Sequence, residues 1–447
     1  MKHYDVAVVG GGISGASLLY VLAAYTDIKS LVLIEKYGTF APLNSQAAAN
    51  SQTIHCGDIE TNYTLQKATK VKRTARMVVK YALLNGLQDK VVFTGQKMAI
   101  GVGDGEVEFI QNRFEEFKSL YPYLEFFKKE DLAKIEPSII FDAKGNERAE
   151  NVVGMGVKEG EYTTINYGDL TNDFILRAKG LKECDTLLFS KVEEIEQNSS
   201  GFVVKMADGT KVEASFVVVN AGAHSLFLAH RMGLGKRFGT LPVAGSFYLT
   251  KKRILNGKVY MVQNPKLPFA ALHGDPDLLA GGRTRFGPTA LVMPKLERFH
   301  GTFASFFEFC KTLNFGSAAT KILLDLLKDS DIRNYIARNF AFEVPYLNKK
   351  LFVKDARKIV PALSEDELYY AEGFGGVRPQ VLDLEEKKLL LGEASIKDNK
   401  GVIFNMTPSP GATSCLGNAE LDAREICEYL GAKFDEAKFN AELTDEA

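Results

Sequence analysis

The first 35 residues contain hydrophobic runs that predict a strand, a helix and a second strand. Residues 4–9 (YDVAVV) and 31–35 (LVLIE) are short, almost wholly apolar runs, typical of buried strands. Between them, residues 14–25 (SGASLLYVLAAY) have the length and composition of a helix. This order predicts a βαβ unit, in which the helix connects two parallel strands.

Similar patterns predict where later elements lie. Residues 65–85 place basic residues between apolar ones with helical periodicity, which predicts an amphipathic helix with a solvated face. Residues 186–220 alternate as short strands around a turn at Asp208-Gly209, which predicts a β-meander. Further strands are expected over 241–290 and amphipathic helices over 303–340.

Length and charge limit the classes of protein to consider. A chain of 447 residues predicts two or three domains and a large buried core. The formal net charge is -1, so no broad positive field would attract a polyanion. We therefore expect no nucleic-acid partner.

Cysteine usage and the absence of long apolar runs suggest a cytoplasmic protein. The five cysteines form no CxxC pair and have no zinc-site spacing, so neither disulfides nor a metal are expected. The N-terminus lacks the features of a signal peptide, and no run of 18 apolar residues predicts a transmembrane helix. Any contact with a membrane is expected to be peripheral.

The loop between the first strand and the helix carries the pattern G-x-G-x-x-G. Its glycines would permit a tight turn, close approach to a pyrophosphate and close helix packing, while the helix N-terminus supplies amides and dipole. An acid that ends the second strand, twenty residues later, would bind ribose hydroxyls. The predicted contacts to the ADP half of a dinucleotide are Gly10, Gly12, Ser14, Gly15, Glu35 and Lys36.

NAD and FAD share this ADP half, so the choice between them rests on later segments. Residues 42–54 (PLNSQAAANSQTI) are small and uncharged, which suits a segment along a cofactor, although an exposed loop is the alternative. An apolar strand ends in FVVVNAGAHS at residues 216–225. Together these features resemble FAD oxidoreductases of the D-amino-acid oxidase superfamily. The resemblance implies that Val192 meets the adenine and that Ala221-Gly222 returns to the cofactor.

Four further segments sharpen the resemblance. The run NSQTIHCGDIETNYT from Asn50 resembles malate:quinone oxidoreductases, as do Leu272-His273 with GGRTRFGP at 281–288, GGVRPQ at 375–380 and PSPGATS at 408–414. The last segment lies between a strand (GVIFNM) and a helix, so a helix N-terminus would face the flavin; an ordinary strand and helix is the alternative. The cofactor contacts implied are Asn50, Ser51, Gln52, Thr53, Val192, Ala221, Gly222, Gly376, Gly411, Ala412 and Thr413.

The resemblance also implies a fold and a division into domains. The fold expected is α/β, α+β overall: a Rossmann-like FAD domain of the D-amino-acid oxidase or glutathione reductase type, with a mostly antiparallel second sheet and helices. Residues 1–90, 150–225 and 360–447 would bind FAD, without a covalent bond. Residues 91–149 and 226–359 would form the substrate domain.

Oxidation of a 2-hydroxyacid needs a cation for the carboxylate, a base for the hydroxyl proton and a hydride acceptor, which would be flavin N5. Arg378 is the first candidate for the cation, because a guanidinium grips a carboxylate bidentately. Arg283 and Arg285 alternate along a strand, so only one of them can face the substrate. Gln380 is a further candidate contact.

His55 and His273 are the candidate bases, alone or together, because a neutral imidazole takes a proton near physiological pH. Either could instead be a hydrogen-bonded structural histidine, as we expect for His224. Cys56 and Cys415 lie near the flavin segments without an attachment motif.

As the resemblance implies, (S)-malate would be oxidised to oxaloacetate and the electrons passed to a membrane quinone, by a peripheral enzyme on the cytoplasmic face. Residues 251–255 or the helices of 303–340 would touch the membrane. The nearest alternative is a related dehydrogenase or oxidase of lactate or 2-hydroxyglutarate. An amine oxidase and a non-catalytic FAD-binding redox sensor are the others.

Overall fold

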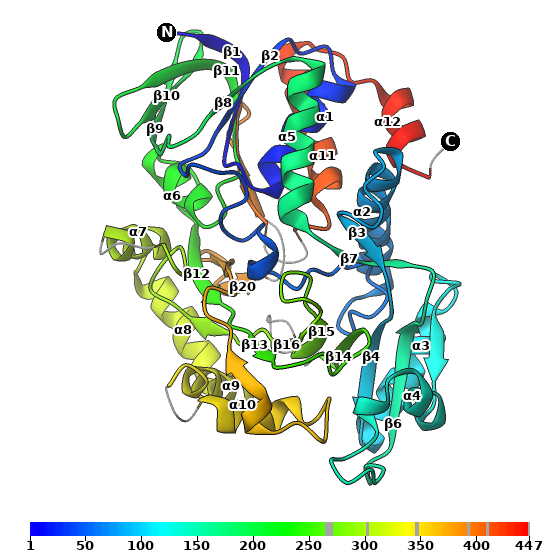
Figure 1. Cartoon of the computed structure of the whole chain (residues 1–447). Coiled ribbons are helices and arrows are strands. Elements are labelled where there is room, and N and C mark those ends of the chain that lie inside the picture. Colours follow the sequence, from blue (N-terminus) through cyan, green and yellow to red (C-terminus); the bar gives the residue numbers. More distant parts are fainter. Residues whose placement is uncertain (264–270, 301–303, 345–347, 391–393, 408–410, 446–447) are drawn as a thin grey trace.

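The computed structural model describes residues 1–263, 271–300, 304–344, 348–390, 394–407 and 411–445. Pro408, Ser409 and Pro410, part of the predicted flavin loop, lie outside them. Figure 1 shows two halves: one built around β1, β2 and β11, the other around β4, β6 and β13 to β16.

The first half is a mainly parallel sheet with the order β21-β22-β11-β1-β2-β8. Strand β21 is antiparallel to β22, and the other neighbours along this order are parallel. The bounds are β1 (His3–Val9), β2 (Ser30–Ile34), β8 (Glu183–Leu187), β11 (Lys211–Val219), β21 (Ala394–Lys397) and β22 (Val402–Met406). The predicted βαβ unit is confirmed, with the helix beginning one residue earlier than expected.

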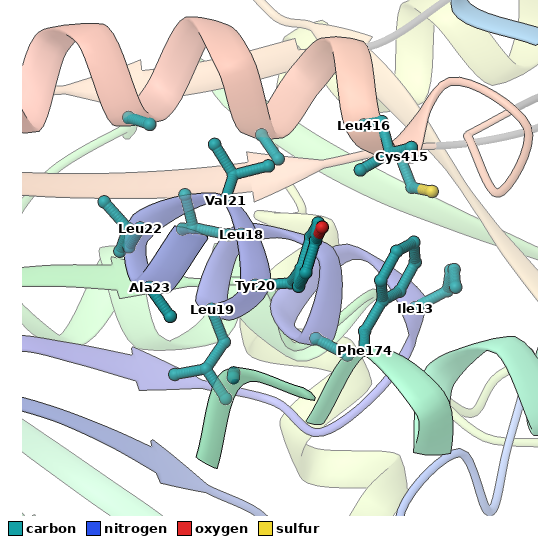
Figure 2. Packing of buried hydrophobic residues seen from close by; sticks show 14 of the residues in the cluster. Ile13, Leu18, Leu19, Tyr20, Val21, Leu22, Ala23, Phe174, Cys415 and Leu416 are labelled. Atoms are coloured by element: carbon teal, nitrogen blue, oxygen red, sulfur yellow. The ribbon is translucent and has the colours of Figure 1, made fainter. Parts of the chain in front are cut away.

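Helices cover one face of this sheet. They pack around α1, which has buried residues on every side. Its apolar side chains contact Phe174 of α5 and Leu416 of α11 (Figure 2). A helix that is apolar all round needs neighbours on every side, which explains the central position of α1. The helices are α1 (Ile13–Tyr25), α2 (Leu65–Leu84), α5 (Tyr167–Leu181), α11 (Cys415–Leu430) and α12 (Glu436–Leu443).

The other face is covered by the predicted meander and a short helix. Strands β9 (Val192–Asn198) and β10 (Gly201–Met206) pair in antiparallel fashion with each other and with the first half of β11. Their apolar residues pack with those of α6 (His224–Arg231). The meander prediction is therefore confirmed.

The second half contains a sheet with the order β18-β13-β16-β15-β14-β4-β6-β5, antiparallel except between β14 and β4. Its strands are β4 (Lys97–Val102), β5 (Glu125–Phe127), β6 (Val152–Val157), β13 (Tyr248–Thr250), β14 (Lys258–Met261), β15 (His273–Pro276), β16 (Thr284–Gly287) and β18 (Leu368–Tyr370).

Two smaller sheets adjoin it. One has the order β17-β12-β19-β20 and the other pairs β3 with β7. Their strands are β3 (Val92–Thr94), β7 (Tyr162–Ile165), β12 (Phe238–Ala244), β17 (Leu291–Val292), β19 (Val377–Asp383) and β20 (Lys388–Leu390).

Helices flank this half on both sides (Figure 1). Those predicted over 303–340 are confirmed as α7 to α9. The set is α3 (Asp104–Phe117), α4 (Lys129–Ile135), α7 (Ala304–Leu313), α8 (Ser317–Lys328), α9 (Ser330–Ala341) and α10 (Asn348–Ala356), with short 3₁₀ turns at η1 (Ala47–Ala49), η2 (Pro137–Ile139) and η3 (Glu365–Glu367).

Strand pairing departs from the predicted domain boundaries in two places. Strand β6 was assigned to the cofactor domain but pairs with β4 and β5. Likewise β18, β19 and β20 fall within 360–447 yet pair only with strands of the second half. Short apolar strands such as β6 (VVGMGV) show burial in their sequence but not their partner. The division into domains stays a prediction.

Candidate active site

An elongated pocket runs from the end of β2, past the N-terminus of α1, to the loop before α11. Eleven residues predicted to touch the cofactor line this one pocket, although they come from six separate parts of the chain. They are Gly10, Gly12, Ser14, Glu35, Lys36, Val192, Ala221, Gly222, Gly376, Gly411 and Ala412. The pocket is therefore lined both by segments predicted to bind the nucleotide and by segments predicted to bind the flavin.

The glycine loop has the shape that the motif predicts. Gly10 has φ +110°, a conformation that favours glycine, and a Cβ at Gly15 would collide with the carbonyl oxygen of Gly10. Gly12 caps α1 without a side-chain hydrogen bond; the Ile13 amide donates to the Ser45 hydroxyl at 2.9 Å, and the first residues of the helix line the pocket. A helix N-terminus that lines a pocket is suited to bind phosphate. Gly15 itself does not line the pocket; it allows the close packing of helix and strand.

Glu35 is held firmly at the end of β2. One carboxylate oxygen accepts a hydrogen bond from the Gly11 amide at 2.8 Å, and the other accepts one from the Tyr37 amide at 2.9 Å. Burial raises the pKa of Glu35, and these amide bonds oppose the rise. Neighbouring Lys36 also lines the pocket, but its ammonium forms an ion pair with Glu297.

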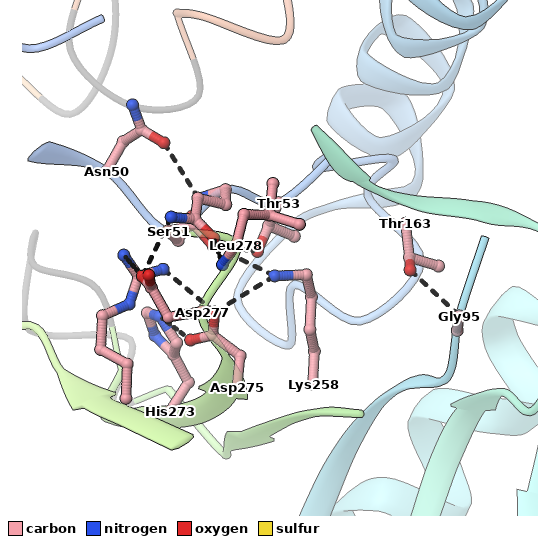
Figure 3. Close-up of polar contacts among 12 residues, drawn as sticks. Asn50, Ser51, Thr53, Gly95, Thr163, Lys258, His273, Asp275, Asp277 and Leu278 are labelled. Atoms are coloured by element: carbon pink, nitrogen blue, oxygen red, sulfur yellow. Dashed lines mark hydrogen bonds and ion pairs between the residues drawn. The ribbon is translucent and has the colours of Figure 1, made fainter. Parts of the chain in front are cut away.

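Five predicted cofactor residues lie beside the pocket, where the two halves of the protein meet. Gln52 donates to Asp277 at 3.0 Å, and Thr53 shares a hydrogen bond with Tyr260 at 2.7 Å. The carbonyl oxygen of Ser51 accepts a hydrogen bond from Lys258 (Figure 3). Asn50 accepts from the Gln52 amide, and Thr413 accepts from the His55 amide at 3.3 Å. This segment therefore joins the second sheet to the loop before α11.

A buried charge cluster lies under this segment (Figure 3). Strands β15 and β16 place Asp275 opposite Arg285, whose guanidinium bonds it at 3.0 Å and lies 2.9 Å from Asp277. Lys258 donates to Asp275 at 3.3 Å. Arg285, a predicted substrate contact, is wholly buried and is already paired with two carboxylates of the protein.

His273 belongs to this cluster and is poorly suited to take a proton. It is 1% exposed and stacks on Tyr260 with a centroid distance of 4.3 Å. Burial lowers the pKa of His273 to about 3; Asp275 acts in the opposite direction, and the cations Arg285 and Lys258 lower it further. Its Nε2 lies 3.4 Å from Asp275 and has no hydrogen-bond partner in the part of the chain that the structure describes.

His55 occupies a different setting, beside the loop before α11. Its Nδ1 lies 2.5 Å from the carboxylate of Glu60, and its Nε2 lies 3.2 Å from the Ser51 hydroxyl. The imidazole meets the Tyr260 ring edge-on at 6.2 Å. Both candidate histidines thus contact the same tyrosine: His55 is partly exposed beside Glu60, and His273 is buried in the charge cluster with Asp275, Arg285 and Lys258.

Arg378 lies on β19, two residues after Gly376 of the pocket. Within the described ranges it makes no ion pair, and burial lowers its pKa, opposed only by the hydroxyls of Tyr335, Tyr260 and Tyr63. Gln380 is buried and shares its strand face with Arg378. Arg283 lies in the turn before β16, where it donates to the Ala280 carbonyl and lies over the Tyr369 ring.

Sequence analysis missed Glu60, Tyr260, Lys258 and Asp275. A partial signal was present: HGDPD at 273–277 and GGRTR at 281–285 are joined by a glycine turn, and such a hairpin places Asp275 opposite Arg285. Glu60 lies only five residues after His55, in the segment already singled out. Nothing in the sequence marked Tyr260.

Two expected absences concern the described part of the chain. Among its residues no group of three His, Cys, Asp or Glu side chains is arranged to hold a metal. Its helices include none with the length and apolar content needed to cross a bilayer.

Comparisons with known proteins identify the family of the chain. Residues 2–427 match the family model described as malate:quinone oxidoreductase (Mqo). A probable malate:quinone oxidoreductase of Campylobacter jejuni is 56% identical over 445 residues, 99% of each chain. A malate:quinone oxidoreductase of Helicobacter pylori is 48% identical over 445 residues, 99% of this chain and 98% of its own.

Among solved structures, the FAD-bound L-α-glycerophosphate oxidase of Mycoplasma pneumoniae superposes with a TM-score of 0.66 at 19% identity, covering 97% of this chain and 96% of its own. The fold is therefore that of the FAD-dependent oxidoreductases related to D-amino-acid oxidase, as the sequence predicted. The chain belongs to the malate:quinone oxidoreductase family.

Proposed function

We propose that this protein oxidises (S)-malate to oxaloacetate with FAD as hydride acceptor and passes the electrons to a membrane quinone. Family membership supports the reaction. The structural observation that carries the proposal is Arg378: a half-buried cation on β19, two residues after Gly376 of the pocket, that forms no ion pair with a described residue. A substrate carboxylate would supply the missing partner.

The residues present fit FAD. The start of α1 with Gly10, Gly12 and Ser14 would hold the pyrophosphate, and Glu35 the ribose. Gly411 and Ala412 precede α11 at the other end of the pocket, where amides would face the flavin. When bound, the flavin supplies the hydride acceptor.

Non-covalent binding is supported by the two thiols near the flavin segments. Burial raises the pKa of both Cys56 and Cys415 to about 12, so neither is a thiolate at neutral pH. Denaturing the purified protein with acid should release all of the flavin into the supernatant. A yellow pellet after precipitation would refute this part of the proposal.

Arg378 is proposed as the carboxylate clamp and His55 as the base. A guanidinium holds a carboxylate bidentately, and the tyrosine hydroxyls around Arg378 supply donors for the second carboxylate of malate. His55 Nε2 would accept the hydroxyl proton while the C2 hydrogen leaves as hydride to the flavin. Tyr260 contacts His55 and acts on the charge of Arg378, which supports their acting on one substrate.

The helices α7 to α9 are proposed to contact the membrane and its quinone. They and the turn between α7 and α8 expose large apolar side chains, while residues 251–255 offer less because Leu255 is fully buried. We place this contact on the cytoplasmic face. The exposed side chains are Phe306, Phe307, Phe315, Leu324, Leu327 and Phe340.

The reaction is tested by anaerobic mixing of the yellow protein with (S)-malate, L-lactate, L-2-hydroxyglutarate and several amino acids. We expect malate to bleach the flavin absorbance fastest, and a soluble quinone to restore it faster than oxygen. Faster bleaching by lactate or 2-hydroxyglutarate would assign the substrate to the related dehydrogenases. Bleaching by an amino acid alone would refute the proposal, and no bleaching by any acid would indicate a redox sensor.

Membrane contact is tested by sedimentation with phosphatidylcholine and phosphatidylglycerol vesicles. Replacing Phe315, Leu324 and Phe340 together by serine should weaken binding about tenfold or more, because each buried apolar side chain contributes roughly 1.5–3 kcal/mol. The matched control is Leu176→Ser on α5, which is 71% exposed on the other half of the molecule. Equal binding by the triple variant and the control would reject this surface.

A further inference from the structure

The contact between His55 and Glu60 suggests a role for a residue outside the predicted site. Nδ1 of His55 lies 2.5 Å from one Glu60 oxygen, and both side chains are largely buried, 17% and 10% exposed. The other Glu60 oxygen is buried and has no hydrogen-bond partner among the described residues. The short, shielded contact makes the imidazole the principal partner of this carboxylate.

This geometry determines which imidazole nitrogen carries the proton. An ionised carboxylate only accepts hydrogen bonds, so Nδ1 must donate and Nε2 must be unprotonated in the neutral ring. Nε2 then accepts from the Ser51 hydroxyl, 3.2 Å away. The same orientation would present Nε2 to a substrate hydroxyl.

Several charged and polar groups surround the His55–Glu60 pair. Lys97 of β4 is buried and ion-paired with Asp58 at 2.8 Å, and its positive charge also acts on Glu60. Tyr123 donates to the same Asp58, and Tyr260 of β14 and Cys56 are neutral neighbours at pH 7. Glu161 adds a negative charge that acts on the neighbouring Cys56. Of these carboxylates, Glu60 is the one that contacts the ring.

Ionisation of Glu60 itself agrees with this picture. Burial raises the pKa of Glu60, but the hydrogen bond and charge of His55, with the charge of Lys97, bring it below its ordinary value. An ionised Glu60 stabilises the imidazolium that forms when the substrate hydroxyl gives up its proton.

We propose that Glu60 is a positioning residue that keeps the His55 proton on Nδ1, so that Nε2 receives the proton of the substrate hydroxyl. This inference rests on the proposed function, because it acts through His55 as the base. It also agrees with the choice of His55 over His273: burial lowers the pKa of His273 to about 3 although Asp275 lies beside it, whereas His55 is less buried and contacts Glu60.

The kinetic test is Glu60→Gln, which keeps the size of the side chain and removes its charge. We expect kcat with malate to fall about 10²-fold while KM changes less than threefold, since general base catalysis contributes roughly 10²–10⁴-fold. The acid limb of the pH profile should move about one unit lower, because the imidazolium loses a nearby negative charge. Glu60→Asp should recover part of kcat.

The matched control is Glu161→Gln, which removes a nearby carboxylate that does not touch His55. Its kcat and pH profile should stay within twofold of the wild type. An unchanged pH limb in Glu60→Gln, or the same shift in both variants, would overturn the proposal.

A second readout needs no substrate. Nitrogen chemical shifts of histidine-labelled wild-type holoenzyme, with His55 assigned by its loss in His55→Gln, should report a proton on Nδ1 at pH 8. A proton on Nε2 would overturn the inference even if malate is the substrate. Failure of malate to bleach the flavin, with the Nδ1 proton present, would instead reject the proposed function.

Discussion

Two histidines lie against Tyr260 with different partners and different degrees of burial. His273 stacks flat on the ring, fully buried, with Arg285 and Lys258 close by. His55 meets the ring edge-on and is paired with Glu60. The sequence resemblance placed both in segments expected near the substrate, so position alone could not separate them. Burial does: it lowers the pKa of His273 to about 3 although Asp275 opposes the change, whereas 17% of the His55 side chain is exposed.

The largest predicted effect, and the strongest test of this comparison, is the loss of turnover when His55 is replaced. In His55→Gln, turnover of malate with a soluble quinone should fall about 10³-fold or more, as expected for loss of a general base together with its orientation. The flavin spectrum should be unchanged, because the side chain of His55 does not line the nucleotide pocket. Retention of more than a tenth of wild-type turnover would disprove the assignment.

The next largest effect is expected for Arg378, the cation proposed to bind the carboxylate of the substrate on which His55 acts. Arg378→Met should lower kcat/KM for malate about 10²–10³-fold, since truncating one partner of a buried charge pair costs roughly 3–5 kcal/mol. The loss should appear mainly in KM. Arg231→Met on the exposed end of α6 is the control and should keep wild-type kinetics; equal kinetics for both variants would exclude the clamp.

The cations around His273 are expected to matter for folding more than for turnover. Arg285→Met removes the positive charge that pairs with buried Asp275 and Asp277. The free energy of unfolding should therefore fall by about 3 kcal/mol in denaturant titration. Adding Asp275→Asn should recover part of the loss if the two side chains are coupled. Strictly additive losses would show that their pairing is not what stabilises the hairpin.

The smallest predicted effect is the pH dependence of stability. The folded-state pKa of His273, about 3, lies below its ordinary value of 6.5, so the unfolded chain binds more protons between these values. Its contribution is fully present above pH 6.5 and is lost as pH falls toward 3. Denaturant titrations at pH 7 and 4.5 should show a larger fall in the wild type than in His273→Gln. Equal falls would contradict a neutral, buried His273.

Local patterns predicted the cofactor half well. The strand, helix and strand of residues 3–34 and the meander follow from periodicity that is contained within each element. The roles of Gly10 and Gly15 followed as well, because the motif carries its own geometry.

The substrate half was less predictable because its site depends on pairing between distant strands. Whether Arg285 is available to a ligand depends on the β15–β16 register, which places Asp275 opposite it. Likewise, Tyr260 acts on the charge of Arg378 although β14 and β19 belong to separate sheets. Spacing predicted that Arg283 and Arg285 alternate along one strand, but β16 begins at Thr284, so Arg283 lies in the turn before it.

The most direct test of the account is anaerobic stopped-flow reduction of the flavin by (S)-malate in His55→Gln and His273→Gln, compared with the wild type. This measurement isolates the step in which the hydroxyl proton and the hydride leave the substrate. We predict that His55→Gln reduces about 10³-fold more slowly, while His273→Gln stays within tenfold of the wild type. Rapid reduction in His55→Gln with a large loss in His273→Gln would contradict the account.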